Sequence, residues 1–336
     1  MLSVSFSVPL KNKLLVPIYL RLGTSVGYND NIFKFSSSEK NSIDSYNYMG
    51  SSSNYDSSII KPEFRLSYSP KLFKNNMSNF VLYTSSSNYP SVVDKNGLYM
   101  SIRFEYKIGP YNWIKFGYKN SANNFLRFFS DDDIPGNDYL KCNYDSESVF
   151  FSYSMSLKPY GWVKFGFSKG TQLFNPNFTE FDLEINTIDL KYYFNFNDFS
   201  YSLSLKNDNA NNLTYANGLN STAFDRSYNS SSIAFKVGKM MNKYLKKINF
   251  GYGVTKPSYV SEALSDPLHS GRSHYEQFIS LSLLKELRND ISIELKYRIR
   301  NRQTNSEFDW VEALKSFSDN QVMVKVIYYT ELDLFY

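Results

Sequence analysis

The chain contains little cysteine and histidine, and it has no long apolar run. Its single cysteine, Cys142, excludes an internal disulfide and a cysteine-based zinc site, and we expect a free thiol in a loop. The longest apolar run, residues 14–20 (LLVPIYL), is much shorter than the ~18 residues that a membrane-spanning helix requires. Glycine-rich phosphate loops, dinucleotide motifs and metal-binding His/Cys patterns are also missing, so we expect no metal and no cofactor.

The net charge and the first residues of the chain bear on its partners and its targeting. The net charge of +5 is small for 336 residues and the basic residues are spread out, so nucleic acid is not an expected partner. Residues 1–13 (MLSVSFSVPLKNK) have no basic n-region, long apolar h-region or small-residue cleavage site, so no secretory signal is visible. We expect these residues to be a periplasmic lead-in or the remainder of a truncated start.

Aromatic residues are abundant in a chain that is otherwise polar. Phe, Trp and Tyr make up 18% of the residues, with 29 Tyr and 28 Phe, yet the mean hydropathy is −0.42. A soluble protein of this polarity has little need for so many rings, whereas a transmembrane β-barrel alternates apolar and polar residues along each strand. The composition therefore favours a barrel.

Apolar and polar residues alternate along the whole chain in segments of about ten residues, the length that a tilted strand needs to cross a membrane. Fourteen such segments can be counted, and in the clearest, residues 291–300 (ISIELKYRIR), the alternation is unbroken. A soluble β-sandwich also alternates, so this pattern alone does not settle the class. With the features below, it predicts one all-β domain over residues 1–336, a closed antiparallel transmembrane β-barrel of about 14 strands, with 12 or 16 as alternatives.

The connections alternate between short and long, as in bacterial barrels with short periplasmic turns and longer external loops. Six turns and seven loops place both termini on the periplasmic side. The expected turns are residues 70–76, 109–112, 158–161, 195–198, 240–246 and 287–290. The expected loops are residues 29–57, 86–96, 121–143, 172–182, 208–226, 257–272 and 303–318, of which 29–57 and 121–143 are the candidates to constrict the lumen.

A repeated string follows two of the short turns. Residues 109–121 read GPYNWIKFGYKNS, and residues 158–170 read KPYGWVKFGFSKG. Each copy starts a strand directly after a periplasmic turn, so its Tyr and Trp should form an aromatic girdle at the membrane interface. A repeated hairpin in a soluble sheet is the alternative interpretation. The expected girdle residues are Tyr111, Trp113, Tyr160 and Trp162.

The C-terminal segment resembles the signal by which bacterial barrels are recognised for assembly into the outer membrane. Apolar residues from Val322 onward share one face and the last residue is aromatic. The resemblance implies the barrel-assembly machinery as a partner. The sequence departs from the pattern at Glu331 and Asp333, which leaves the end of the last strand open. The expected signal residues are Tyr328, Leu332, Leu334 and Tyr336.

Two local strings resemble β-barrel porin families of Gram-negative bacteria. Residues 27–33 (GYNDNIF) are similar to the first-strand motif of these families, and residues 297–305 (YRIRNRQTN) with 319–322 (DNQV) are similar to their final hairpin. The resemblance implies a bacterial outer-membrane location, with lipid and lipopolysaccharide around the barrel. Porins often form homo-oligomers, but no self-complementary patch is recognisable here. The barrel of surface-lipoprotein translocators is a more distant alternative.

The polar faces of the predicted strands would line a pore, and they carry more basic than acidic residues. Partly desolvated cations in a wet pore favour anions, so we expect an anion-attracting lumen. The Arg at 298, 300 and 302 could be a track for anionic or acidic-sugar solutes, or could pair with Glu294, Glu105 and neighbouring strands to fill the barrel. The expected inward residues are Arg21, Arg65, Arg103, Lys107, Lys115, Lys119, Lys164, Lys191, Lys206, Lys236, Lys247, Lys296, Arg298, Arg300, Arg302 and Lys325, with the acids Glu63, Glu105, Asp189, Glu276 and Glu294.

These patterns favour a porin-like channel for small hydrophilic solutes, with anions as a candidate class. A non-conducting surface barrel that binds a partner or polysaccharide through its loops is the first alternative, and an export component for exopolysaccharide or lipoprotein is the second. We do not expect an enzyme. His269 and His274, with Ser270 and Ser273 beside them and Asp266 or Glu276 as the acid, could form a hydrolase site, but a polar loop is the simpler interpretation. Asp131, Asp132 and Asp133 could bind Ca²⁺ but lack regular ligand spacing.

Overall fold

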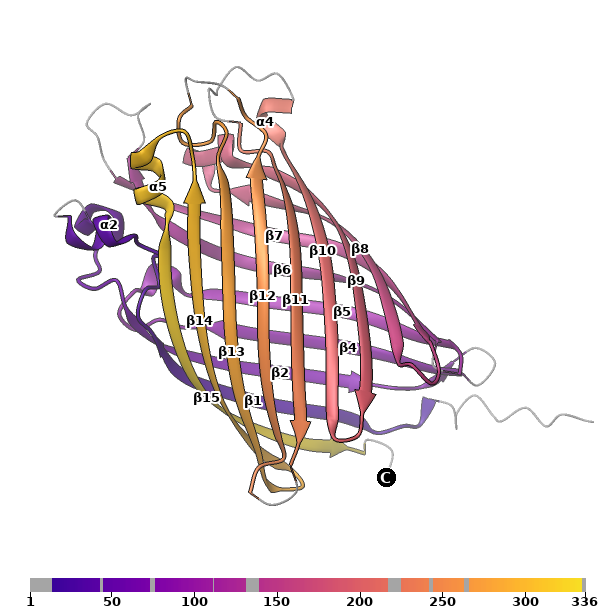
Figure 1. Ribbon diagram of the computed structural model, residues 1–336. Helices are drawn as coiled ribbons and strands as arrows, with labels where there is room; N and C mark the ends of the chain where they lie inside the picture. Colours follow the sequence, from indigo (N-terminus) through magenta and orange to yellow (C-terminus); the bar gives the residue numbers. More distant parts are fainter. Residues whose placement is uncertain are drawn as a thin grey trace, which may run out of the picture.

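The computed structural model describes residues 14–42, 45–72, 76–110, 112–130, 139–216, 225–241, 244–262 and 266–333. Most of these residues belong to one antiparallel sheet that curves into a barrel (Figure 1). The strands are β1 (Ile18–Asn29), β2 (Ser57–Tyr68), β3 (Lys71–Leu72), β4 (Asn76–Ser87), β5 (Gly97–Gly109), β6 (Asn112–Ser130), β7 (Tyr139–Ser156), β8 (Trp162–Phe174), β9 (Leu183–Phe196), β10 (Phe199–Asn212), β11 (Tyr228–Met240), β12 (Lys247–Tyr259), β13 (Ser273–Arg288), β14 (Ile291–Asn305) and β15 (Phe317–Leu332).

The sheet is closed. The first strand, β1, pairs along its whole length with both β2 and β15, and β2 pairs with β4. The two-residue β3 pairs only with the start of β4, so it belongs to a turn and fourteen strands form the wall. Closure leaves no sheet edge without a partner, which is the condition for strands to cross a bilayer. The predicted closed fourteen-strand antiparallel barrel is confirmed.

The outer face of the barrel is apolar and exposed. Leu295 is 41% exposed and Val324 is 46% exposed, and they lie on neighbouring strands that pair at these positions. Exposed apolar side chains recur on alternate residues of the other strands, for example Ile279 and Leu281 of β13. An apolar band of this extent is costly in water but stable against acyl chains. The alternation in the sequence therefore separates an apolar outside from a polar inside.

One glycine of the first-strand motif is required by packing. A Cβ atom added to Gly27 would lie 2.0 Å from the carbonyl oxygen of Val322 and 2.4 Å from the sulfur of Met323. Gly27 faces Met323 across the β1 and β15 pair, so the Met323 side chain occupies the space above Gly27. A larger residue at position 27 would push the first and last strands apart.

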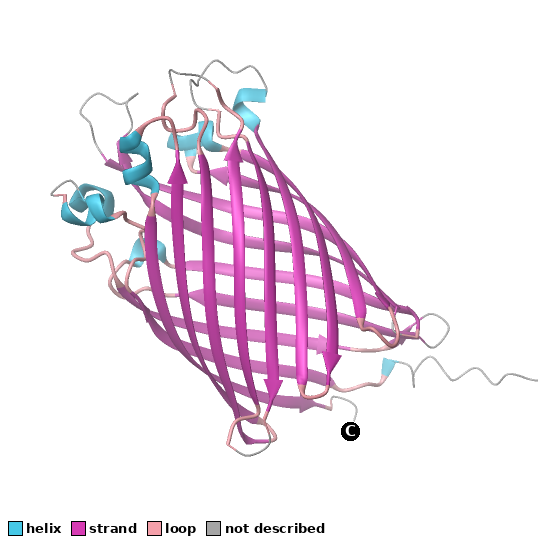
Figure 2. Ribbon diagram, viewed as in Figure 1, coloured by secondary structure: helices cyan, strands magenta, loops and turns pink. Residues whose placement is uncertain are grey.

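The turns lie at one end of the barrel and the longer connections at the other (Figure 2). The long connections hold α2 (Ser37–Asn41), α3 (Ser45–Met49), η1 (Val93–Lys95), η2 (Pro176–Phe181), α4 (Leu213–Ala216) and α5 (Asp309–Lys315). α2 begins with a capping box, in which Ser36 and Glu39 bond to each other's backbone N–H. Within the described ranges, no helix is both long and apolar enough to cross a membrane.

The predicted bounds of the loop at residues 121–143 are wrong. β6 continues to Ser130 and β7 begins at Tyr139, so this region is a long hairpin. The polar residues at positions 121–124 read as a loop in the sequence. In the structure they form a register shift between Ser121 and Asn124 within the paired strands. Cys142 consequently lies in a strand and not in a loop, fully buried against Phe174 and Phe178.

Candidate functional site

The luminal face of each strand is the face opposite to the exposed apolar side chains. Residues that lie directly opposite each other on paired strands point to the same face, so the register identifies it. Arg21 lies opposite Arg65, Lys164 opposite Lys191, and Glu294 opposite Lys325. The residues expected to line a pore share this face: Arg21, Arg65, Arg103, Lys107, Lys115, Lys164, Lys191, Glu294, Lys296, Arg298, Arg300 and Arg302, together with Lys119, Lys206, Lys236, Lys247 and Lys325.

Near the junction of first and last strands, one carboxylate serves two cations. Glu63 of β2 forms ion pairs with Arg21 of β1, at 3.9 Å, and with Lys325 of β15. A second carboxylate, Glu105, lies 2.7 Å from Arg103 and 3.3 Å from Lys115, and it also accepts a hydrogen bond from the Asn79 amide. Each acid is thus shared, and the positive charge around it exceeds its own.

Strands β8 to β10 carry a second set of luminal ion pairs, each of one lysine with one aspartate. Lys164 lies 3.6 Å from Asp189, and Lys206 lies 2.6 Å from Asp208. Asp208 was missed by sequence reasoning because residues 208–226 were expected to form a loop, whereas β10 continues to Asn212. The signal that could have placed it is the alternation with Lys206, which shares its face.

The three arginines of β14 are paired, but with partners other than those expected. Arg300 and Arg302 both bind Glu276 of β13, at 2.6 Å and 2.8 Å, and Arg298 lies 3.6 Å from Asp319 of β15. Glu294 and Glu105 do not serve this ladder, since their positions lie nearer the other end of the strands. Three cations share two acids, so the ladder keeps a positive excess.

Several luminal lysines have no acidic partner. Across the described ranges, no ion pair includes Lys107, Lys191, Lys236, Lys247 or Lys296. Lys236 and Lys296 are also exposed on this face. These side chains supply uncompensated positive charge inside the barrel.

Two residues of the expected aromatic girdle, Trp113 and Trp162, lie on the luminal face and not on the outside. Trp113 shares the luminal face of Lys115, whose ammonium lies 6.0 Å from its ring, and Trp162 stacks on Tyr193 at 3.9 Å on the face of Lys191. The two-residue period puts any residue two positions before a luminal lysine on the luminal side. Tyr160 lies exposed in the turn before β8, and its place in a girdle stays a prediction.

The remaining terminal and loop predictions divide between described and undescribed residues. Tyr328 and Leu332 are on the exposed apolar face of β15, which ends at Leu332. Their role in assembly stays a prediction. The predictions for residues 1–13, Tyr111, Asp131, Asp132, Asp133, Leu334 and Tyr336 lie outside the described residues.

The connection between β1 and β2 packs across the mouth opposite to the turns. Ile32, Phe33 and Phe35 are buried with Phe125 of β6 and Val92 of the β4 and β5 connection. The Arg127 guanidinium of β6 donates to the Phe33 carbonyl at 3.2 Å and forms an ion pair with Glu39. This packing reaches from β1 to β6, so the connection expected to constrict the lumen is anchored on a strand that is not its neighbour.

Cations gather around this connection. Lys34 has a left-handed backbone, with φ of 59°, and lies half-buried near Arg300 and Arg302. Burial first, and then the neighbouring Arg300, Lys95 and Arg302, lower the pKa of Lys34 to about 7, while Glu276 opposes the shift. Burial also lowers the pKa of Lys95 to about 8, helped by Arg127.

The α5 helix carries a further lysine with a lowered pKa at this mouth of the barrel. Burial, followed by the charges of Arg127 and Arg272, lowers the pKa of Lys315 to about 7. Glu39 opposes the shift, and Arg226 adds to it. Lys315 therefore lies among cations from β6 and from the connections around β11 and β13.

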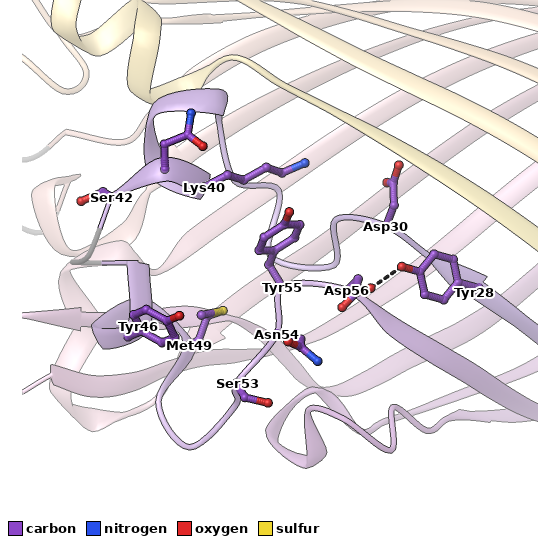
Figure 3. A pocket seen from close by; sticks show the side chains of 11 residues that line it. Tyr28, Asp30, Lys40, Ser42, Tyr46, Met49, Ser53, Asn54, Tyr55 and Asp56 are labelled. Atoms are coloured by element: carbon purple, nitrogen blue, oxygen red, sulfur yellow. Dashed lines mark hydrogen bonds between the residues drawn. The ribbon is translucent and has the colours of Figure 1, made fainter.

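A polar pocket of about 650 Å³ opens beside the β1 and β2 connection (Figure 3). Tyr28 donates a hydrogen bond to Asp56, and the Lys40 ammonium lies 4.9 Å from the Tyr55 ring. Tyr46 lines the same pocket. Tyrosine rings beside carboxylates and a lysine provide flat surfaces together with hydrogen-bonding groups.

Part of the geometry expected of a hydrolase site is present around His269 and His274. Asp266 binds the His269 ring at 2.8 Å, and burial lowers the pKa of His269 to about 4. His274 instead bonds Thr304, and Glu276 is occupied by the two arginines. The ring contacts that the described residues show therefore join His269 to Asp266 and His274 to Thr304.

Comparison with known proteins identifies the fold. No family model matches the chain, and no curated protein matches it. The outer membrane channel DcaP of Acinetobacter baumannii matches with a TM-score of 0.50 at 8% identity, over 93% of this chain and 96% of that one. Outer-membrane expressed OmpT of Vibrio cholerae matches with a TM-score of 0.50 at 9% identity, over 93% and 97%. At these identities the likeness shows the fold alone: this chain has a β-barrel fold similar to those of outer-membrane proteins.

Proposed function

We propose that this chain is a porin-like channel of a Gram-negative outer membrane that passes small hydrophilic solutes and prefers anions. The observation that carries the proposal is the excess of basic side chains on the luminal face of a closed barrel whose outer face is apolar. Lipid, lipopolysaccharide and the barrel-assembly machinery are the partners that such a location implies.

The physical reason for anion preference is the weak screening of charges inside a narrow pore. Charges in a confined, partly desolvated lumen are screened less by salt than charges on an open surface. Shared acids such as Glu63 and Glu105 cancel only part of the positive charge around them. Lysines without an acidic partner, such as Lys236 and Lys296, add to the remainder. A permeating anion would therefore meet a favourable potential along the wall.

The test is the reversal potential of the purified protein in planar lipid bilayers under a KCl gradient. We expect channels that are more permeable to Cl⁻ than to K⁺. A preference for K⁺ would overturn the anion proposal, and the absence of channels from correctly folded protein would overturn the channel proposal.

A second candidate function is binding of a saccharide at the outer loops by a barrel that need not conduct. The pocket at the β1 and β2 connection favours it, because Tyr46 and Tyr55 offer ring faces and Asp56 offers a carboxylate for hydroxyl groups. Titration with purified polysaccharide fragments would test it. Binding that is lost in Tyr55→Ala but kept in Tyr244→Ala, a change in a turn at the other end, would support it.

A further inference from the structure

Two arginines at the mouth are held by aromatic rings and not by carboxylates. Arg226 lies 4.5 Å from the Phe181 ring and 5.2 Å from the Phe174 ring, and Arg272 lies 4.0 Å from the Tyr259 ring. Among the described residues, no ion pair includes Arg226 or Arg272. This differs from the lumen, where Arg21, Arg103 and the β14 arginines bind acids.

A ring contact leaves an arginine available to an anion. A guanidinium that stacks on a ring keeps its full charge and its N–H donors, which point outward in the plane of the group. Arg272 is only 5% exposed, and its Nε is buried without a hydrogen-bond partner in the described structure. A buried donor without a partner is costly, so it marks a place where an acceptor is missing.

Lys315 belongs to the same end of the barrel as Arg272: its neighbour Ser316 accepts a hydrogen bond from the Thr304 N–H at 3.0 Å, and the Thr304 hydroxyl bonds the ring of His274, two residues after Arg272. Its charge interacts with those of Arg272 and Arg226, and no ion pair includes it among the described residues. Three acids of this region bind other side chains: Glu39 binds Arg127, Glu276 binds Arg300 and Arg302, and Asp266 binds His269. We call Arg226, Arg272 and Lys315 the mouth cluster.

The mouth cluster concentrates like charge in a half-buried place, which costs free energy unless an anion compensates it. A single monovalent anion would leave much of that charge in place. Two or more oxyanion groups on one small molecule match three cations better, and each N–H to oxyanion hydrogen bond is charge-assisted. The cluster is therefore suited to a polyvalent solute.

We infer that the mouth cluster is a capture site for small solutes that carry two or more carboxylate or phosphate groups. The inference deepens the proposed function and rests on it, because it names the substrate class of an anion-preferring channel. Arg226 and Arg272 bind the oxyanion groups through their N–H edges. Lys315, at the end of the α5 helix, supplies the third charge.

The test compares tricarballylate and pyrophosphate with acetate, in calorimetry on detergent-solubilised protein and as blockers of KCl current. We expect both polyvalent anions to bind and to block at concentrations at least about tenfold below acetate. The double change Arg226→Gln with Lys315→Gln should weaken binding by about tenfold for each cation removed. The charge-keeping change Arg226→Lys with Lys315→Arg should retain most of it.

The matched control is Arg288→Gln, which removes one cation at the turn end of the barrel, where Arg288 binds Asp290. We expect it to leave binding and block unchanged. Equal affinity of wild-type protein for acetate and both polyvalent anions would overturn the inference, and so would full binding by a folded double variant. If the double variant does not fold, the wild-type comparison and the charge-keeping variant still decide.

The two proposals fail in different ways in this experiment. Calorimetry needs no channel, so polyvalent binding without any conductance would leave the capture site in place and overturn the channel. Anion-preferring conductance without preferential binding of polyvalent anions would leave the channel proposal in place and overturn the capture site. Binding of pyrophosphate alone would narrow the solute class to phosphates, and binding of tricarballylate alone would narrow it to carboxylates.

Discussion

Arg127 and Glu39 are 88 residues apart in the chain, and their ion pair fastens the connection between β1 and β2 to strand β6 at the mouth of the barrel. The Arg127 side chain is 13% exposed and that of Glu39 4% exposed, so water screens the pair little. The same guanidinium lies 5.0 Å from the Phe35 ring. This contact keeps the connection packed at the mouth.

Loss of the Arg127 charge should loosen this connection. Arg127→Gln leaves Glu39 buried without its partner, which we expect to cost about 3 kcal/mol of local stability. The single-channel conductance should then rise or fluctuate between levels. The double change Arg127→Gln with Glu39→Gln should be milder, because neither charge is left alone. Steady, wild-type conductance in Arg127→Gln would show that the connection does not restrict the pore.

Removal of the β14 arginine ladder should reduce anion preference. Changing Arg298, Arg300 and Arg302 to Gln leaves Glu276 and Asp319 as net negative groups on the wall. The ratio of Cl⁻ to K⁺ permeability from reversal potentials should fall, and Glu276→Gln alone should raise it. An unchanged ratio in the folded triple variant would mean that the ladder only fills and stiffens the barrel.

Anion preference should weaken as the pH rises from 6 to 9. The pKa values of Lys34 and Lys315 are lowered to about 7 and that of Lys95 to about 8, so these lysines lose their charge in this range. Lys34 faces Arg300, Arg302, Lys95 and Glu276, while Lys315 faces Arg127, Arg226, Arg272 and Glu39. Reversal potentials at each pH would measure the effect. Lys34→Met with Lys315→Met should flatten the profile, and a flat profile in the wild type would contradict the assignment.

The same lysines should make the folded barrel more stable as the pH rises. Their folded pKa values lie below the ordinary value of 10.5, so between about 7 and 10.5 the unfolded chain binds more protons. The stability that these lysines contribute to the folded barrel therefore increases through this window, and it is lowest below pH 7. Unfolding in lipid vesicles at pH 6 and pH 9 would show the difference, which the double Met variant should reduce.

A charge on the outer face should cost more than a charge on the luminal face. Leu281 and Ser280 are neighbours in β13, and Leu281 is 42% exposed on the apolar side. Leu281→Arg should destabilise the barrel in lipid by about 2 to 4 kcal/mol if it lies near the midplane. Ser280→Arg, on the other face, should cost much less. Equal losses in both variants would contradict the assignment of the two faces.

The wall of the barrel could be predicted from sequence because it depends on local alternation. Ile293 and Leu295 face outward and Glu294 and Lys296 inward for the same reason that their residue types alternate. The positions of the short turns also follow from local signals. These features need no knowledge of which strands meet.

The mouth could not be predicted because it depends on contacts between distant segments. Nothing in residues 121–143 indicates that Phe125 will be covered by Phe33, or that Cys142 will pack on Phe174, and without these contacts the stretch reads as a loop. The pairing of Arg298 with Asp319 likewise depends on register between strands. Trp113 reads as an interface residue by type, although its position two residues before Lys115 puts it on the luminal face.

The claim beneath these proposals is that the exposed apolar side chains, such as Leu295 and Val324, lie against acyl chains. Flotation with lipid vesicles, after dilution of the denatured chain into them, tests this most directly. We expect the protein to fold, to float with the vesicles and to resist extraction by salt and alkali. Folded protein that stays monodisperse in detergent-free buffer and does not enter vesicles would contradict it.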